Sequence, residues 1–239
     1  MERRDVLKLG LGSTAGVLAA GVVGLDSLVY GDSCKSKACK EGKKMKKYQY
    51  PNEHYYKNGV FQTEVAKQAY YEMFADMHYS LGEMLKTSKD FWAVDFGLGD
   101  FAHAGMGGIF WVNDKEFRYF GHDIYLLPGQ MIPEHFHLAA EGLPAKHEFW
   151  QVRHGSIYNF GKGGEKTPEV LAMLPKSQLD AGAVTCFNYK VLNVGDTGRL
   201  TAIADPHFMM AGPEGAIVTE YGCYHSMDGL GFTNKKASL

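Results

Sequence analysis

The spacing of apolar side chains divides the chain into one helical stretch followed by many short strands. Residues 61–86 carry apolar side chains at steps of four, which predicts one amphipathic helix packed on a core: Val65, Ala69, Met73, Met77 and Leu81. After Lys89 short β-type runs alternate with turn residues, including Gly-Pro-Glu-Gly at 212–215. The predicted strands are 107–112, 117–120, 124–127, 131–137, 148–152, 156–160, 184–187, 199–203 and 216–221. This pattern predicts an all-β domain, a single antiparallel barrel or double-sheet jelly roll with a short N-terminal helical segment.

The first 31 residues have the pattern of a targeting segment. Arg3 and Arg4 precede a Gly/Ala/Val/Leu stretch from Leu9 to Gly24, which contains five glycines and is short for a membrane span. This resembles a twin-arginine export signal. We therefore expect an exported, periplasmic or otherwise extracytoplasmic protein with no stable membrane partner beyond the signal. A retained N-terminal anchor is the alternative.

Residues 32–47 form the predicted linker between this segment and a single domain at 48–239. From Cys34 to Lys47 there are seven lysines and hardly an apolar residue, a composition that cannot offset its ordering entropy. Cys34 and Cys39 could close a short disulfide loop in an oxidising compartment. Cys186 and Cys223 lie in strand-like sequence and are expected to be small buried side chains.

The two parts of the chain differ in net charge. Residues 1–47 carry ten Lys/Arg against five Asp/Glu, so the formal charge of −2 leaves 15 basic and 22 acidic residues in 48–239. An acidic body argues against nucleic acid as a partner.

Two histidines stand out from the ten in the chain. His135 and His137 are separated by one residue, so both imidazoles project from the same face of a strand. Such a pair inside a barrel suits Zn, Mn, Fe, Ni or Cu. Glu148 and His207 extend the pattern, and the four residues resemble the cupin signature: glycine, five residues, H-x-H, a later glutamate, six residues, glycine, and a histidine from a second motif.

Neighbouring residues compete for these roles. The general cupin spacing selects Glu141, but only Glu148 has a glycine, Gly155, at the required distance. His147 adjoins Glu148 and is expected on the opposite face of its strand. His154 is expected at a turn, facing solvent. A structural role is the alternative for His207, because Asp205-Pro206-His207 replaces the usual turn of the second motif.

A more specific resemblance covers about residues 60–232. Its motifs are Phe91-Trp-Ala-Val-Asp95-Phe96-Gly97-Leu-Gly99-Asp100-Phe101, the H-x-H segment from Leu126, Lys146-His-Glu148 with Arg153 and Gly155, and a late His207 with Glu220. Together they resemble the D-lyxose isomerase family of cupins (double-stranded β-helix proteins). The resemblance implies aldose–ketose isomerisation of a free sugar such as D-lyxose or D-mannose. It also implies one divalent metal, usually manganese, with Zn, Fe or Co as alternatives, and a homodimer.

Isomerisation chemistry gives roles to particular residues. His135, His137, Glu148 and His207 are the predicted metal ligands, which leave open positions on an octahedral ion for two sugar oxygens. Glu220 and Lys146 are the candidates for proton transfer. A solvated turn lysine and a salt-bridged strand glutamate are the respective alternatives.

The C-terminal region departs from the family pattern. Where the family has an Asn-Asp-Asp cluster, this chain has Glu220-Tyr-Gly-Cys223-Tyr-His225-Ser-Met-Asp228, so His225 and Asp228 are the predicted hydroxyl contacts. This change leaves the identity of the sugar open. A metal-dependent cupin oxygenase and a noncatalytic, exported sugar-binding cupin are the alternative functions.

Overall fold

The computed structural model of the 239-residue chain describes residues 46–87 and 89–239. The predicted export segment 1–31, nearly all of the predicted linker, and Cys34 and Cys39 lie outside these residues. The described elements are η1 (Asn52–Tyr55), β1 (Tyr56–Lys57), β2 (Val60–Phe61), α1 (Thr63–Asp76), α2 (Glu83–Lys86), β3 (Phe91–Val94), β4 (Met106–Asp114), β5 (Tyr119–Leu126), β6 (His135–His137), β7 (Glu148–Gly161), α3 (Pro168–Met173), α4 (Lys176–Asp180), β8 (Asn188–Asn193), β9 (Thr197–Arg199), β10 (His207–Cys223), η2 (Met227–Gly229) and β11 (Leu230–Phe232).

The helix predicted over 61–86 is two helices in the structure. α1 buries Ala69, Met73 and the residues beside them against the sheet, as its spacing predicts. It ends after Asp76 because His78 adopts a φ of 52° and the Tyr79 amide donates back to the Phe74 carbonyl at 2.9 Å. This left-handed turn closes the helix and separates it from α2.

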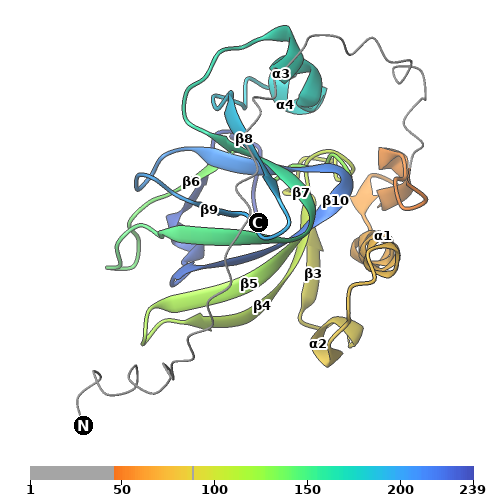
Figure 1. Cartoon of the computed structure of the whole chain (residues 1–239), viewed down its shortest axis with the longest axis horizontal. Helices are drawn as coiled ribbons and strands as arrows, with labels where there is room; N and C mark the ends of the chain where they lie inside the picture. Colours follow the sequence, from red (N-terminus) through yellow and green to blue (C-terminus); the bar gives the residue numbers. More distant parts are fainter. Residues whose placement is uncertain (1–45, 88) are drawn as a thin grey trace, which may run out of the picture. The chain divides into compact units, whose positions relative to one another are not determined.

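The strands form a curled antiparallel sheet, as the predicted all-β cupin fold requires. Within the described residues nine strands join, with β11-β6-β10-β5-β4-β3 in order and β7 pairing with β10, β8 and β9. β10 is the central strand, since it pairs with β5, β6 and β7. Figure 1 shows the sheet curling around an interior, with α1 alongside β3.

Several predicted strand boundaries are wrong, because a strand can continue through a local irregularity. The ranges 148–152 and 156–160 are one strand, β7, which passes through Gly155 opposite a register shift in β10. The predicted turn at 212–215 lies within β10, where the register shifts opposite Gly155. The ranges 117–120 and 124–127 likewise belong to one strand, β5.

Other segments differ from the prediction in their secondary structure. Residues 184–187 do not form a strand, because the amides of Thr185 and Cys186 donate to the Glu134 carboxylate. Only the end of 131–137 is a strand, and β9 ends at Arg199. The sequence pattern does not predict β1, β2, β3, β8, β11, α3 or α4.

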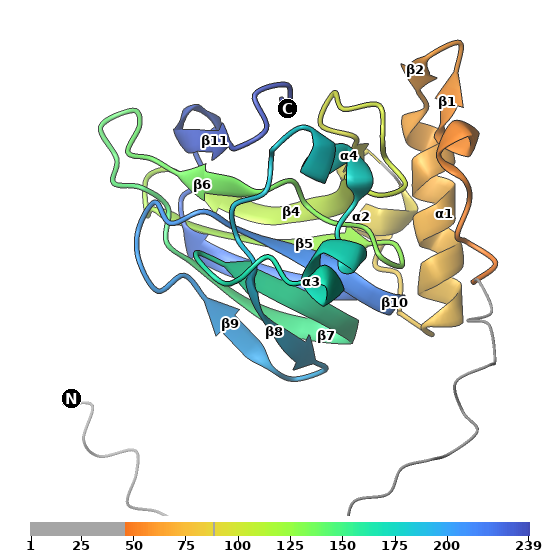
Figure 2. The ribbon, with the colours of Figure 1, turned by 90° about the horizontal axis from the view of Figure 1, so that it is seen from above.

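The core is continuous from the helical layer into the sheet. Tyr70, on α1, hydrogen-bonds to Gln130 at 2.7 Å and joins the helix to the loop before β6. Figure 2 shows α1 at one edge of the sheet, with α3 and α4 over another part of it.

Cys186 is buried and Cys223 half-buried, and both are free. None of the helices in the described ranges is long and apolar enough to span a membrane.

Candidate active site

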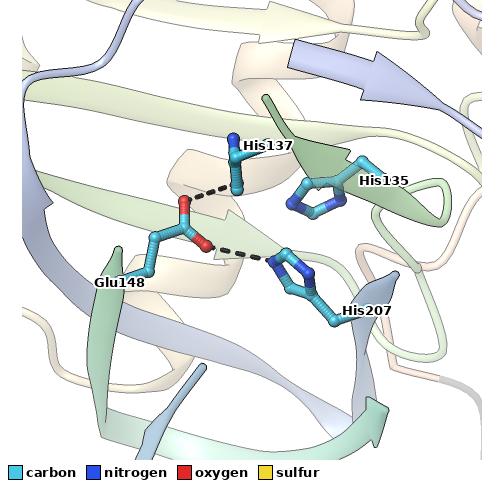
Figure 3. Close-up of side chains that lie close together, drawn as sticks. All are labelled: His135, His137, Glu148 and His207. Atoms are coloured by element: carbon cyan, nitrogen blue, oxygen red, sulfur yellow. Dashed lines mark hydrogen bonds and ion pairs between the residues drawn. The ribbon is translucent and has the colours of Figure 1, made fainter. Parts of the chain in front are cut away.

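Four side chains predicted as metal ligands meet inside the curled sheet. His135 and His137 come from β6, Glu148 from the first position of β7, and His207 from the first position of β10. His207 pairs directly with His135 across the strands. One ligand atom from each residue lies within 4.8 Å of those of the other three (Figure 3). We call these four residues the His/Glu group.

The competing residues lie elsewhere. Glu141 is exposed and hydrogen-bonds to Lys115 and Ser226, so of the two glutamates Glu148 is the one that lies with the three histidines. His147 is exposed, as predicted for the opposite face of the strand. His154 corrects the sequence analysis: it lies within β7, is half-buried, and its ring packs against Tyr79 at 5.5 Å.

Backbone carbonyls orient two of the imidazoles. Nδ1 of His135 lies 3.0 Å from the Pro133 carbonyl, and Nδ1 of His207 lies 3.0 Å from the Asp205 carbonyl. A proton on Nδ1 that is donated to a carbonyl leaves Nε2 with its lone pair, the arrangement found in metal-ligating histidines.

The carboxylate of Glu148 is at the centre of the His/Glu group. Its Oε2 lies 3.1 Å from His207 Nε2, and its Oε1 lies 2.9 Å from His137 Nε2. Despite this proximity, His137 Nε2 has no aligned hydrogen-bond partner among the described residues. A buried nitrogen in that state suits coordination to a cation.

Electrostatics favour an ionised Glu148 and a neutral His135, whereas the pKa of His207 is raised, because its contact with the Glu148 carboxylate outweighs burial. Burial, with the imidazoles of His207 and His137, holds the pKa of His135 well below its usual range. Burial alone would raise the pKa of Glu148, but Lys146 and the imidazoles of His137 and His207 hold it well below its usual value. Neutral imidazole nitrogen and ionised carboxylate oxygen are the ligand forms that a divalent first-row ion requires. The donor set of three imidazoles and one carboxylate therefore fits such an ion, which would bind His207 in its neutral form.

Lys146 and Glu220 form a buried pair beside the His/Glu group. Lys146 Nζ lies 2.6 Å from Glu148 Oε1 and 2.9 Å from Glu220 Oε1, and both Lys146 and Glu220 are 5% exposed. Burial opposes the charged amine, but the carboxylates of Glu148 and Glu220 outweigh it and raise the pKa of Lys146. The burial of Lys146 contradicts the solvated-lysine alternative, whereas Glu220 does lie in a strand, β10, and is salt-bridged to Lys146, as its own alternative has it.

These groups face one cavity of about 210 Å³, whose wall is mostly aromatic and aliphatic. His225 lines it, and burial together with the Lys146 charge lowers the pKa of His225 to about 3, so its ring is neutral. Asp228 is exposed and does not line this cavity, which leaves its predicted sugar contact without structural support.

The cavity wall also contains polar side chains that the sequence pattern does not indicate, among them Trp92 and His122. His122 lies directly opposite Glu220 in the β5–β10 register. Alternation along 119–126 could have indicated an inward side chain at this position, but its partner depends on strand register.

Similarity to characterised proteins agrees with this geometry. The chain is 33% identical over 146 residues to the D-lyxose/D-mannose isomerase of Thermosediminibacter oceani, covering 60% of this chain and 76% of that protein. It is 32% identical over 128 residues to the D-lyxose ketol-isomerase of Cohnella laeviribosi, covering 54% and 67%. No family model matches the chain.

Solved structures share the fold. The L-ribose isomerase of Cellulomonas parahominis superposes with a TM-score of 0.53 at 17% identity, covering 73% of this chain and 92% of that one. The L-ribose isomerase of Acinetobacter sp. DL28 in complex with L-ribose gives 0.54 at 17% identity, covering 72% and 91%. These likenesses support the cupin fold, while the sequence relatives go further and show that the chain belongs to the D-lyxose isomerase family.

Proposed function

We propose that the protein is an aldose–ketose isomerase that acts on a free sugar, D-lyxose or D-mannose, with one divalent metal ion. The observation that carries the proposal is the buried Lys146–Glu220 pair, 2.9 Å apart and directly beside the His/Glu group. A carboxylate and an ammonium next to a cation site are the groups needed to move a proton between adjacent carbons.

The metal would be held by His135, His137, Glu148 and His207, and manganese is our proposed ion. When bound, such an ion supplies Lewis acidity that polarises the sugar carbonyl and favours negative charge on the neighbouring oxygen. Zn, Fe and Co are the alternatives, because availability as well as ligand type decides occupancy.

Glu220 acts in this proposal as the base at carbon. Conversion of an aldose to a ketose moves one proton from C2 to C1 and another from O2 to O1. The Glu220 carboxylate takes the C2 proton and returns it to C1.

Lys146 transfers protons to and from the sugar oxygens O1 and O2. Its ammonium donates hydrogen bonds to O1 and O2, passes a proton to O1 and regains one from O2. The carboxylates on both sides keep it charged between turnovers. The neutral ring of His225, on the same cavity, supplies a further contact for a sugar hydroxyl.

Incubation of the manganese-loaded protein with a panel of aldoses and ketoses in deuterated water tests this function. We expect turnover of D-lyxose or D-mannose, with deuterium at C1 of the ketose or C2 of the aldose. Oxygen consumption with bound iron would instead support a cupin oxygenase. Sugar binding without turnover by the fully metallated protein would support a binding protein.

We also propose that the enzyme is exported and works outside the cytoplasm as a homodimer. Arg3, Arg4 and the apolar stretch that follows support export. Because twin-arginine export carries folded proteins, the ion would be loaded in the cytoplasm. Fractionation of cells that express the full chain, followed by light scattering of the purified protein, tests both points.

A further inference from the structure

One wall of the cavity carries polar atoms that nothing in the structure satisfies. Within residues 46–87 and 89–239, the buried atoms without a hydrogen-bond partner include Trp92 Nε1, both ring nitrogens of His122 and His225 Nδ1. All three side chains line the same cavity, as do Trp150 and His137, whose Nε1 and Nε2 atoms are likewise without a partner. His122 is 5% exposed, so bulk water does not compensate for its missing hydrogen bonds.

Strand register places this wall beyond the proposed base. His122 on β5 pairs with Glu220 on β10, and its Nε2 lies 3.6 Å from Glu220 Oε1. The Trp92 ring, on β3, lies one step farther, 6.4 Å from the His122 ring. The cavity therefore presents, in order, the His/Glu group, Lys146, Glu220, His122 and Trp92.

The Trp92 ring is held in place by its neighbours. Gly108, its partner on β4, leaves the space that the indole fills: a Cβ there would lie 2.5 Å from the Trp92 ring. Phe110 packs beside both polar side chains, with ring centroids 5.8 Å from Trp92 and 5.0 Å from His122. The wall thus combines fixed polar atoms with an aromatic face.

Leaving these polar atoms unpaired costs free energy unless a ligand supplies their hydrogen-bond partners. The indole N–H only donates, whereas a neutral imidazole donates from one nitrogen and accepts at the other. A row of sugar hydroxyls offers both kinds of partner, and the C–H groups between them suit the Phe110 face. An apolar ligand would leave the same atoms unsatisfied.

We infer that His122 and Trp92 bind the sugar hydroxyls beyond the two reacting carbons. His122 binds the hydroxyl on C3, next to the carbon that Glu220 deprotonates, and Trp92 binds the hydroxyl on C4. The inference rests on the proposed isomerase function and deepens it, because it assigns recognition of the configuration at C3 and C4 to this wall.

Two variants remove the polar atoms while keeping the rings: His122→Phe and Trp92→Phe. Each should raise KM for D-lyxose about three- to tenfold, the effect of one neutral hydrogen bond, with a much smaller change in kcat. The matched controls are Trp111→Phe on the exposed part of β4 and His147→Phe at the exposed position just before β7, which should leave both constants unchanged.

Deoxy sugars test the assignment without relying on a variant's folding. The wild-type enzyme should bind 4-deoxy-D-lyxose more weakly than D-lyxose, and Trp92→Phe should add no further loss with the deoxy sugar. The inference would be overturned if Trp92→Phe raised KM equally for D-lyxose and for 4-deoxy-D-lyxose, or if neither variant changed KM. Both results would leave the isomerase function intact.

Calorimetric binding of D-arabinitol, which has the lyxose configuration at the corresponding carbons and cannot isomerise, separates the two proposals. If the wild type binds it and the variants bind it three- to tenfold more weakly, the wall recognises the sugar even without turnover. If neither variant weakens binding, the assignment is wrong whether or not the enzyme turns over sugars.

Discussion

At the residue scale, the placement of one lysine decides what the cavity can do. Lys146 is buried between the carboxylates of Glu148 and Glu220, which compensate for the cost of removing its charge from water. A side chain held this way is positioned before substrate arrives, which reduces the reorganisation needed during reaction.

Replacing Glu220 by Gln should abolish turnover without emptying the His/Glu group. Gln keeps the shape of the side chain but cannot accept the C2 proton, so kcat should fall by about 100-fold or more. Steady-state kinetics together with metal analysis by mass spectrometry measures both effects. Glu141→Gln, at the exposed alternative glutamate, is the matched control and should behave as wild type. An E220Q enzyme with more than a tenth of wild-type kcat would rule out the assigned base.

Residue-level features of the site were predictable where they depend on local spacing. The two-residue step of His135 and His137, and the Lys146 and Glu148 pair, project together whatever the rest of the fold does. His122 and Trp92 could not be found this way, because their place depends on the register of β5 with β10 and of β3 with β4.

At the element scale, a bulge shapes the long strands that carry the site. Gly155 in β7 has a φ of 69°, and it faces a register shift in β10. A glycine can adopt this conformation inside a strand, so the chain bends without ending it. In the sequence the same glycine predicts a turn, so the pattern indicates two short strands where the structure has the single strand β7.

Substitution of Gly155 by Ala should destabilise the fold by about 2–4 kcal/mol, through the left-handed φ and steric overlap. A Cβ at this position would lie 2.0 Å from the Gly215 carbonyl oxygen. Urea unfolding measures the loss. Gly161→Ala is the control in the same strand, since a Cβ there meets nothing within 4 Å. Equal stability of the two variants would contradict the bulge argument.

Glu134 fixes the strand that presents the two histidines. Its carboxylate accepts hydrogen bonds from the Thr185 amide and hydroxyl, the Cys186 amide and the Thr233 hydroxyl, all at 2.7–2.9 Å. Long-range contacts of this kind, absent from local spacing, make 184–187 a loop although its composition is strand-like.

Glu134→Gln should cost about 2–4 kcal/mol of stability, because an amide group would then face donors that now bind a carboxylate. It should also weaken metal binding, since Glu134 directly precedes His135. Denaturant unfolding and manganese titration by calorimetry measure the two effects. Glu116→Gln, at an exposed position, is expected to change neither. Unaltered stability in E134Q would show that the four hydrogen bonds contribute little.

At the scale of the whole molecule, the His/Glu group joins strands that are far apart in sequence. Its residues come from β6, β7 and β10, so an ion bound there would link three parts of the curled sheet. A ligand that binds only the folded state stabilises it by mass action.

Manganese at about 100 times its Kd should therefore add about 2.7 kcal/mol, or roughly 5–10 °C in Tm for a domain of this size. Thermal unfolding of chelator-treated protein with and without added manganese measures the shift. His137→Ala should abolish it, whereas His147→Ala should retain it in full. A manganese shift that persists in H137A would place the ion elsewhere.

Because of where the three tryptophans lie, tryptophan fluorescence can report on the cavity. Trp92 and Trp150 line it, and the Trp150 ring stacks on His207 with centroids 6.2 Å apart, whereas Trp111 is 46% exposed. In a Trp111→Phe protein, all tryptophan emission would then originate at the cavity wall. Paramagnetic manganese should quench that emission, and an arriving sugar should shift it. Ion loading and sugar binding could thus be timed separately in a stopped-flow instrument without any attached dye.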